Sequence, residues 1–197
     1  MNKIIFVEGI SGVSKTTTTT FLFDKLQGMG YKVSSYLEGA NDNPLDPFGG
    51  TYPPVISLIE FTETYLQYWR KFMEAKFDNE FMILDGTLLH HQINDMLREY
   101  RAANEVIINH LSSLLHVILP FNPIIFYLSS SDVAQRLIQA RKSRMQTAPT
   151  EDRIRFWVNR KRVDLYVLER LPVKSQIHDV DNGWDSILDI MVGCITA

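Results

Sequence analysis

Continuous runs of apolar residues, rather than alternating ones, mark the strands predicted along the chain. The stretches "KIIFVE" (3–8), "FMILD" (81–85) and "PIIFYLS" (123–129) are apolar at successive positions. This pattern is typical of strands that are buried on both faces of a parallel sheet. Two further segments, 31–38 and 174–181, complete the predicted strands.

Apolar residues spaced three or four positions apart predict helices between these strands. The segment after the first strand ends at Gly28 and Gly30, which are helix-ending residues. The predicted helices cover 16–30, 55–77, 88–101, 105–119, 131–144, 151–171 and 184–195. Strands that alternate with helices predict an α/β fold of three layers, with helices on both faces of a parallel sheet.

Ligands of such folds bind at the carboxyl ends of the strands, so the residues that follow each strand are the candidates for chemistry. The segment 39–54, after the second predicted strand, is dense in Gly, Pro, Asn and Asp. It therefore reads as a loop. It is long for a plain connection, and loops of this length are usually functional.

The composition narrows the class of protein. The chain has 197 residues, 45% of them hydrophobic, and a net charge of −3. This length favours one domain, and the charge argues against a nucleic-acid or anionic-membrane binder. A single cysteine, no signal peptide and no long apolar run favour a cytoplasmic protein.

The most specific motif lies directly after the first strand. Residues 9–16, "GISGVSKT", fit G-x-x-x-x-G-K-[ST] at every fixed position except one, where Ser14 replaces the second glycine. A strand before the motif and a helix after it are the context in which backbone N–H groups bind phosphate. We interpret Ser14 as a tolerated variant that narrows or strains the loop.

The motif assigns a role to each of its residues. Lys15 is expected to reach the β and γ phosphates of ATP, and the Thr16 hydroxyl to bind Mg²⁺. The expected nucleotide-binding residues are Gly9, Ser11, Gly12, Val13, Ser14, Lys15, Thr16 and Thr17.

The chain resembles a known group of enzymes at two places. "FVEGISGVSKTT" resembles the start of thymidylate kinase and related P-loop nucleoside and nucleotide kinases, and "FMILDGTLLHHQINDML" is similar to the third strand of adenylate kinase-type enzymes. The resemblance implies a five-stranded parallel sheet, a basic lid, and transfer of the ATP γ-phosphoryl group to a small acceptor with Mg²⁺ as cofactor. It also implies a single P-loop kinase domain over 1–197, with an acceptor-side insert at about 39–78 and a lid at about 141–160.

Two carboxylates follow predicted strands. Asp85 ends the third strand and is a candidate partner of Mg²⁺ beside Thr16, or else part of a turn-forming Asp-Gly pair. Glu38 follows the second strand, where it either accepts a proton from an attacking hydroxyl or is a solvated loop acid. In nucleoside kinases that resemble this chain, a glutamate at this place does the former.

The residues that follow the third strand bear on whether the acceptor carries a phosphate group. Nucleotide kinases hold the acceptor phosphate with arginine, which thymidylate kinases place directly after the third-strand Asp and adenylate kinases four residues after it. The matching positions here are Gly86 and Leu89. The sequence therefore favours an uncharged hydroxyl acceptor, such as a nucleoside, with Arg70 as the candidate that would reverse this interpretation.

Aromatic and imidazole side chains near the acceptor side are ambiguous. Tyr65 and Trp69 lie at helical spacing and either stack on an acceptor base or belong to the core. His90 and His91 follow the third strand and are candidates to line the acceptor pocket. Adjacent histidines point to different faces of a helix, however, so a structural or surface role is the default expectation.

Positive charge is concentrated in one region. Eight of the 20 Lys and Arg residues lie within 141–162. Arg141 and Arg144 end one predicted helix and Arg153 begins the next, which predicts a basic lid that closes over ATP and stabilises the transferred charge. In the alternative reading, the stretch "NRKR" (159–162) is a solvated helix face on which Arg160 pairs with Asp164.

Three functions remain open from the sequence. The leading one is an ATP- and Mg²⁺-dependent kinase of a nucleoside or nucleotide. The second is the same reaction on another hydroxyl compound, such as an antibiotic, a sugar or a metabolite, and the third is a nucleotide-binding regulator without catalysis. The expected partner is a small-molecule acceptor, not a nucleic acid or a membrane; a homodimer stays open.

Overall fold

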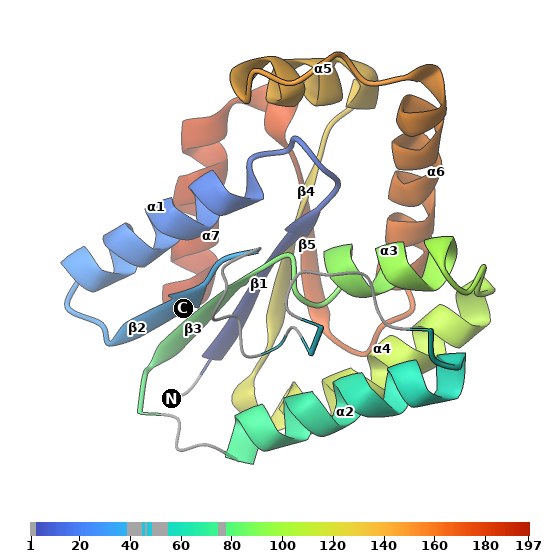
Figure 1. The fold of residues 1–197 in the computed structure, drawn as a ribbon. Helices are drawn as coiled ribbons and strands as arrows, with labels where there is room; N and C mark the ends of the chain where they lie inside the picture. Colours follow the sequence, from blue (N-terminus) through green and yellow to red (C-terminus); the bar gives the residue numbers. More distant parts are fainter. Residues whose placement is uncertain (1–2, 39–44, 46, 49–54, 75–77) are drawn as a thin grey trace.

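A single parallel sheet organises the molecule. The computed structural model describes residues 3–38, 45, 47–48, 55–74 and 78–197. Within them, five strands pair in the order β2-β3-β1-β4-β5, all parallel (Figure 1). Their bounds are β1 Lys3–Gly9, β2 Val33–Tyr36, β3 Phe81–Asp85, β4 Ile124–Ser129 and β5 Lys174–Asp179.

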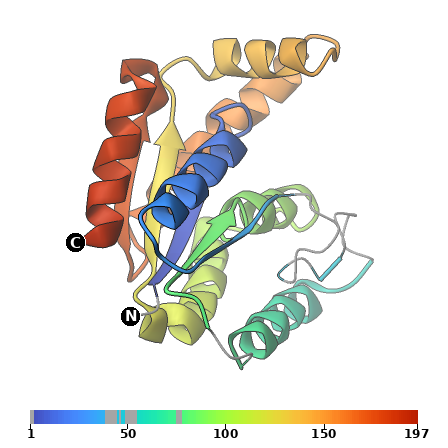
Figure 2. The same ribbon diagram turned by 90° about the vertical axis from the view of Figure 1, so that its left-hand side faces the viewer.

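Helices cover both faces of this sheet. They are α1 Lys15–Gly28, α2 Leu58–Glu74, α3 His90–Arg98, α4 Asn104–Ile118, α5 Val133–Ser143, α6 Glu151–Leu168 and α7 Trp184–Thr196. Helix α7 lies on one side of the strands and α2 on the other (Figure 2). The chain therefore has the three-layer α/β/α fold that its sequence predicts.

The strand β1 shows why its residues are continuously apolar. Ile4 and Phe6 pack into the core on the side of α2 and α4, whereas Ile5 and Val7 pack into the core on the side of α1 and α7. All four side chains are fully buried. Each contributes roughly 1.5–3 kcal/mol by leaving water, so alternation of polarity would have been costly here.

The ends of several elements differ from the sequence-based expectation. The strand predicted over 31–38 covers only Val33–Tyr36, at the edge of the sheet. The helix predicted over 88–101 begins at His90, because Gly86 turns the chain with a φ of 63° after β3. The loop predicted over 39–54 lies outside the described residues except for residues 45, 47 and 48.

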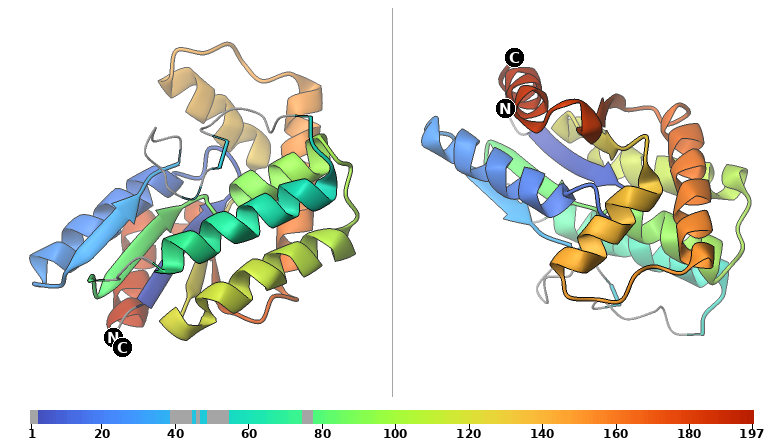
Figure 3. Two further views of the ribbon diagram at one scale, coloured as in Figure 1. Left: turned by 60° about the horizontal axis from the view of Figure 1, so that its bottom comes forward. Right: turned by 90° about the horizontal axis from the view of Figure 1, so that it is seen from above.

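The carboxyl ends of the central strands meet at one edge. The loop after β1 lies there, and α5 crosses the same edge when the molecule is seen from above (Figure 3). Helix α6 continues from α5 through the segment 144–150. In the described part of the chain, no helix is long and apolar enough to cross a membrane.

Candidate active site

The loop between β1 and α1 is shaped by two glycines. Gly9 has a φ of 144°, and a Cβ atom there would lie 2.4 Å from the Leu128 carbonyl oxygen. Gly12 has a φ of 92°, and its Cβ atom would lie 2.9 Å from the Arg136 carbonyl oxygen. Both positions therefore exclude a side chain, because the loop passes directly against β4 and α5.

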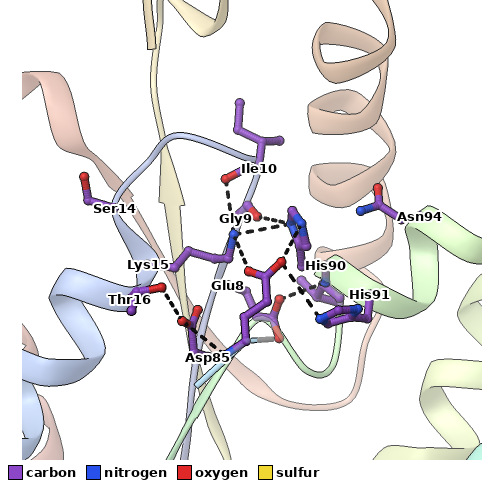
Figure 4. A network of polar contacts seen from close by, with 12 residues as sticks. Glu8, Gly9, Ile10, Ser14, Lys15, Thr16, Asp85, His90, His91 and Asn94 are labelled. Carbon is purple, nitrogen blue, oxygen red and sulfur yellow. Dashed lines mark hydrogen bonds and ion pairs between the residues drawn. The ribbon is translucent and has the colours of Figure 1, made fainter. Parts of the chain in front are cut away.

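Ser14 keeps the conformation of the glycine that it replaces in the motif. Its φ of 64° and ψ of 34° are left-handed, and its backbone caps the start of α1 without a side-chain hydrogen bond. Its side chain points away from the contacts made by Lys15 (Figure 4). A non-glycine residue in this conformation costs roughly 1–2 kcal/mol. The replacement thus places a strained backbone at the start of α1.

Lys15 lies at the centre of the site. Its side chain is 6% exposed, and its Nζ lies 3.2 Å from Glu38 Oε2. The same Nζ lies 3.5 Å from the Ile10 carbonyl oxygen and 3.4 Å from His90 Nδ1 (Figure 4). The ammonium group is therefore held inside the phosphate loop by partners from three segments of the chain.

Thr16 and Asp85 meet as the sequence predicts for a metal-binding pair. The Thr16 hydroxyl donates a hydrogen bond of 2.6 Å to Asp85 Oδ2. The other carboxylate oxygen, Oδ1, is buried and has no hydrogen-bond partner among the described residues. Burial raises the pKa of Asp85 against the opposing effect of Lys15. A buried oxygen without a partner beside a hydroxyl fits Mg²⁺, which prefers hard oxygen ligands.

Glu38 is enclosed by groups that favour its charged form. Its Oε2 contacts Lys15, and its Oε1 lies 3.2 Å from His90 Nε2 and 3.9 Å from His91 Nε2. Burial opposes the charge, but His90, Lys15 and His91 lower the pKa of Glu38 to about 2. An ionised carboxylate therefore stands beside the phosphate loop at neutral pH, in the place predicted for a proton acceptor.

The two histidines are functional candidates that the sequence-based default misses. His90 and His91 both line the pocket described below. The His90 ring stacks on Trp157, with ring centres 5.3 Å apart, and its Nδ1 lies 2.9 Å from the Gly9 carbonyl oxygen. Burial, with the nearby Lys15 charge, lowers the pKa of His90 well below its ordinary value, so the ring is neutral near pH 7. The available signal was their place in the first turn after a strand end.

The buried carboxylate of Glu8 positions the start of α3 beside the phosphate loop. It is fully buried on β1, and its two oxygens accept hydrogen bonds from the backbone N–H groups of Leu88 (2.7 Å) and His90 (2.9 Å). Burial raises its pKa to about 7 although these N–H groups and Lys15 favour the charged form. The carboxylate thus ties the start of α3 to the strand that carries the phosphate loop.

Lys15, Thr16, Glu38 and the two histidines line one pocket of about 620 Å³. The phosphate loop forms one wall, Glu38 with the two histidines another, and α5 a third. Arg144, at the end of α5, lines this pocket as a lid residue should, and so does Arg136. Arg136 is paired with Asp181, their atoms NH2 and Oδ1 being 2.6 Å apart.

The other predicted lid arginines lie outside the described pocket. Arg141 is half-buried and donates to the Thr147 carbonyl oxygen. The Arg153 side chain is exposed in the first turn of α6, and the neighbouring Arg155 pairs with Asp152. Their role in a closed lid stays a prediction.

The predicted acceptor-binding residues of α2 are also outside this pocket. Trp69 is fully buried and its ring stacks on Phe6, with centres 5.8 Å apart. Tyr65 is 2% exposed and packs edge-to-face on Phe61. Arg70 is exposed. The structure places both aromatic rings in the core, and stacking on an acceptor base stays an untested prediction.

Arg160 corrects the reading of 159–162 as a solvated helix face. It is fully buried, and its NH2 lies 2.8 Å from Asp164 Oδ1, which confirms the pairing but not the exposure. The guanidinium also donates to the carbonyl oxygen of Leu89 (2.8 Å) and to Asn94 Oδ1 (2.6 Å). Arg160 therefore joins α6 to the first turns of α3, where the two histidines lie.

Several solved structures have a fold similar to that of this chain. No protein-family model matches the chain, and no curated protein matches its sequence. Among solved structures, the chain is similar to YorR of Bacillus subtilis in complex with phosphorylated GDP, with a TM-score of 0.62, 13% identity, and coverage of 98% of this chain and 95% of that one. It is also similar to a deoxyadenosine kinase from M. mycoides with bound dATP, with a TM-score of 0.58, 15% identity, and coverage of 98% and 100%.

A third similar structure is a gluconokinase from Sinorhizobium meliloti 1021, with a TM-score of 0.52, 14% identity, and coverage of 99% and 92%. The chain has the P-loop kinase fold. Identities this low carry the fold alone, so the chemistry has to be argued from the residues of this chain.

Proposed function

We propose that the protein is an ATP- and Mg²⁺-dependent phosphotransferase that transfers the γ-phosphoryl group to a hydroxyl of a small molecule of the nucleoside or nucleotide type. The proposal rests on one arrangement: buried Lys15 in the phosphate loop contacts Glu38, and the Thr16–Asp85 pair lies beside it. We expect the reaction to take place in the cytoplasm.

Different residues of the chain would have different roles in such a transfer. The backbone of residues 9–16 and the start of α1 would hold the β and γ phosphates, and Lys15 would leave Glu38 to neutralise them. Thr16 and Asp85 would hold Mg²⁺, which supplies positive charge to the phosphate oxygens when bound. Arg144 would add charge from the lid side and help to exclude water.

The acceptor hydroxyl would then attack the γ phosphorus in line with the bond to the leaving ADP. Its oxygen forms a bond to the γ phosphorus while the bond from that phosphorus to the bridging oxygen breaks, which releases ADP. The hydroxyl proton passes to Glu38, which is ionised and freed from Lys15 by the bound phosphates. The products are a phosphate monoester and ADP, and the proton leaves Glu38 to solvent.

Gly86 favours an uncharged acceptor. It follows Asp85 directly, and a Cβ atom there would lie 3.0 Å from Glu38 Oε2 and 3.2 Å from Lys15 Cε. The Glu38–Lys15 pair therefore takes the space that an arginine side chain at this position would need. An ionised Glu38 without such a cation would also repel an acceptor phosphate. Nucleosides fit this site better than nucleotides, and sugars or other hydroxyl compounds remain the second candidate.

The test is ADP release with Mg-ATP across nucleosides, their monophosphates, sugars and antibiotics. We expect one class to stimulate release, and Lys15→Ala to lower the stimulated rate by at least about 10²-fold, because one charged donor to the transition state is lost. Lys25→Ala is the matched control, since Lys25 lies exposed on the same helix and should keep the wild-type rate.

Two outcomes would contradict the proposal. If no acceptor raises the rate above that of Lys15→Ala while ATP still binds by calorimetry, the protein is a nucleotide-binding regulator. If ATP does not bind at all, the phosphate loop with Ser14 is not functional.

A further inference from the structure

His91 offers the pocket a polar atom that makes no hydrogen bond within the described residues. Its Nε2 is buried and has no hydrogen-bond partner among the described residues. The ring as a whole is about 29% exposed and lines the pocket. A buried polar atom without a partner costs stability, so its position at a ligand pocket calls for an explanation.

The unused atom faces Glu38. His91 Nε2 lies 3.9 Å from Glu38 Oε1, which is too long for a direct hydrogen bond. A hydroxyl oxygen placed about 2.8 Å from each atom forms a triangle whose third side is this separation. Such a hydroxyl would donate its proton to Glu38 Oε1 and accept a hydrogen bond from the N–H of His91. The second lone pair of Oε1 remains available for His90 Nε2, which lies 3.2 Å away.

We propose that Glu38 Oε1 and His91 Nε2 together bind the reacting hydroxyl of the acceptor, and that the two groups as a pair select an alcohol against a phosphate at this point. This inference rests on the proposed phosphotransferase function. It assigns the binding of the acceptor to His91, a residue that has no part in the phosphoryl transfer described above. His91 orients the oxygen lone pair, and Glu38 takes the proton.

The geometry explains why Glu38 and His91 together would bind an alcohol in preference to a phosphate. An alcohol has both a proton to donate and a lone pair to accept with, so it satisfies the carboxylate and the imidazole at once. An ionised phosphate oxygen has no proton for Glu38 and brings a second negative charge against it. A site built to bond a hydroxyl rejects molecules that cannot complete those bonds.

The test compares His91→Leu and His91→Gln with the wild type. The acceptors are nucleosides, their 5′-monophosphates and simple sugars, with ADP release as the rate and calorimetric binding of the acceptor in the presence of ADP as the second readout. We expect His91→Leu to lower kcat/KM for the preferred alcohol by about tenfold or more, with KM for ATP unchanged within about twofold. His91→Gln should recover part of the loss, because its amide can donate the same hydrogen bond.

The experiment has a control variant, and its outcomes distinguish a failure of this inference from a failure of the proposed function. His116→Leu removes an exposed histidine of α4 that bonds only its own helix, and it should behave as wild type. Wild-type acceptor kcat/KM in His91→Leu, or stimulation by monophosphates and not by alcohols, overturns this inference while the kinase stands. No stimulation by any acceptor above the Lys15→Ala rate overturns both.

Discussion

The burial of Glu8 predicts that the stability of the fold depends on pH. Glu8 is fully buried, and its pKa is raised to about 7 from an ordinary value of 4.5. A raised carboxyl pKa means that the folded state binds the proton more tightly than the unfolded state does. Glu8 therefore destabilises the fold progressively as the pH rises from about 4.5 to about 7, and its effect is constant above that range.

Replacing Glu8 by glutamine should remove this dependence. We expect the difference in unfolding free energy between wild type and Glu8→Gln to shift by up to roughly 3 kcal/mol between pH 4.5 and 7, in favour of the variant at the higher pH. Urea unfolding at several pH values measures it. Glu74→Gln, at the exposed end of α2, is the control, and parallel curves for wild type and Glu8→Gln would contradict the assignment.

At the scale of elements, the packing of α6 against α3 depends on one buried cation. Arg160 crosses from α6 to the carbonyl oxygens of Leu89 and His90, and its charge is balanced by Asp164. Asp164 in turn accepts a hydrogen bond of 2.9 Å from Tyr127 on β4. The network thus joins the helix after the lid to the helix that carries the histidines and to the sheet.

Removing this cation should be costly. We expect Arg160→Leu to lower the free energy of unfolding by about 3–5 kcal/mol, because it leaves the Asp164 charge buried without a cation beside it. Chemical denaturation measures it, and the double variant with Asp164→Leu should recover much of the loss. Arg155→Ala breaks an exposed pair with Asp152 and should change stability by less than about 1 kcal/mol. Equal effects of the two single variants would show that burial does not matter here.

At the scale of the whole molecule, the pocket is assembled from separate layers. The phosphate loop comes from the centre of the sheet, Glu38 from the end of β2, and Arg144 from the end of α5. Closure of the segment between α5 and α6 over the phosphates would bring Arg144 to the transferred group. We therefore expect the opposite walls of the pocket to approach each other when ATP binds.

Arg144 should consequently act on the rate more than on binding. We expect Arg144→Ala to lower kcat by at least about 10²-fold, with a much smaller change in KM for ATP, because the lost charge serves the transition state. Steady-state kinetics with the preferred acceptor measures both constants. Arg170→Ala, next to the end of α6 and bonded to Tyr166, is the control. A rise in KM alone would assign Arg144 to ground-state binding.

The amino-acid sequence by itself determined the order of strands and helices and the phosphate loop, because these depend on local periodicity and on neighbouring residues. Lys15, Thr16 and Asp85 could be named as candidates for the same reason: each stands at the end of a buried strand or in a motif with its flanking elements. Strain at Ser14 was one of the two effects expected from the glycine position that it occupies, and its left-handed backbone in the structure is the source of that strain.

Only the tertiary structure decided which side chains meet. Glu38 and His91 are far apart in the sequence, and they converge because β2, β3 and β1 are neighbours in the sheet and end at one edge. The burial of Arg160 depends on α6 packing against α3, which helical spacing cannot reveal. Burial and orientation arise from contacts between distant segments, and these contacts convert a kinase-like pattern into a specific proposal for the acceptor site.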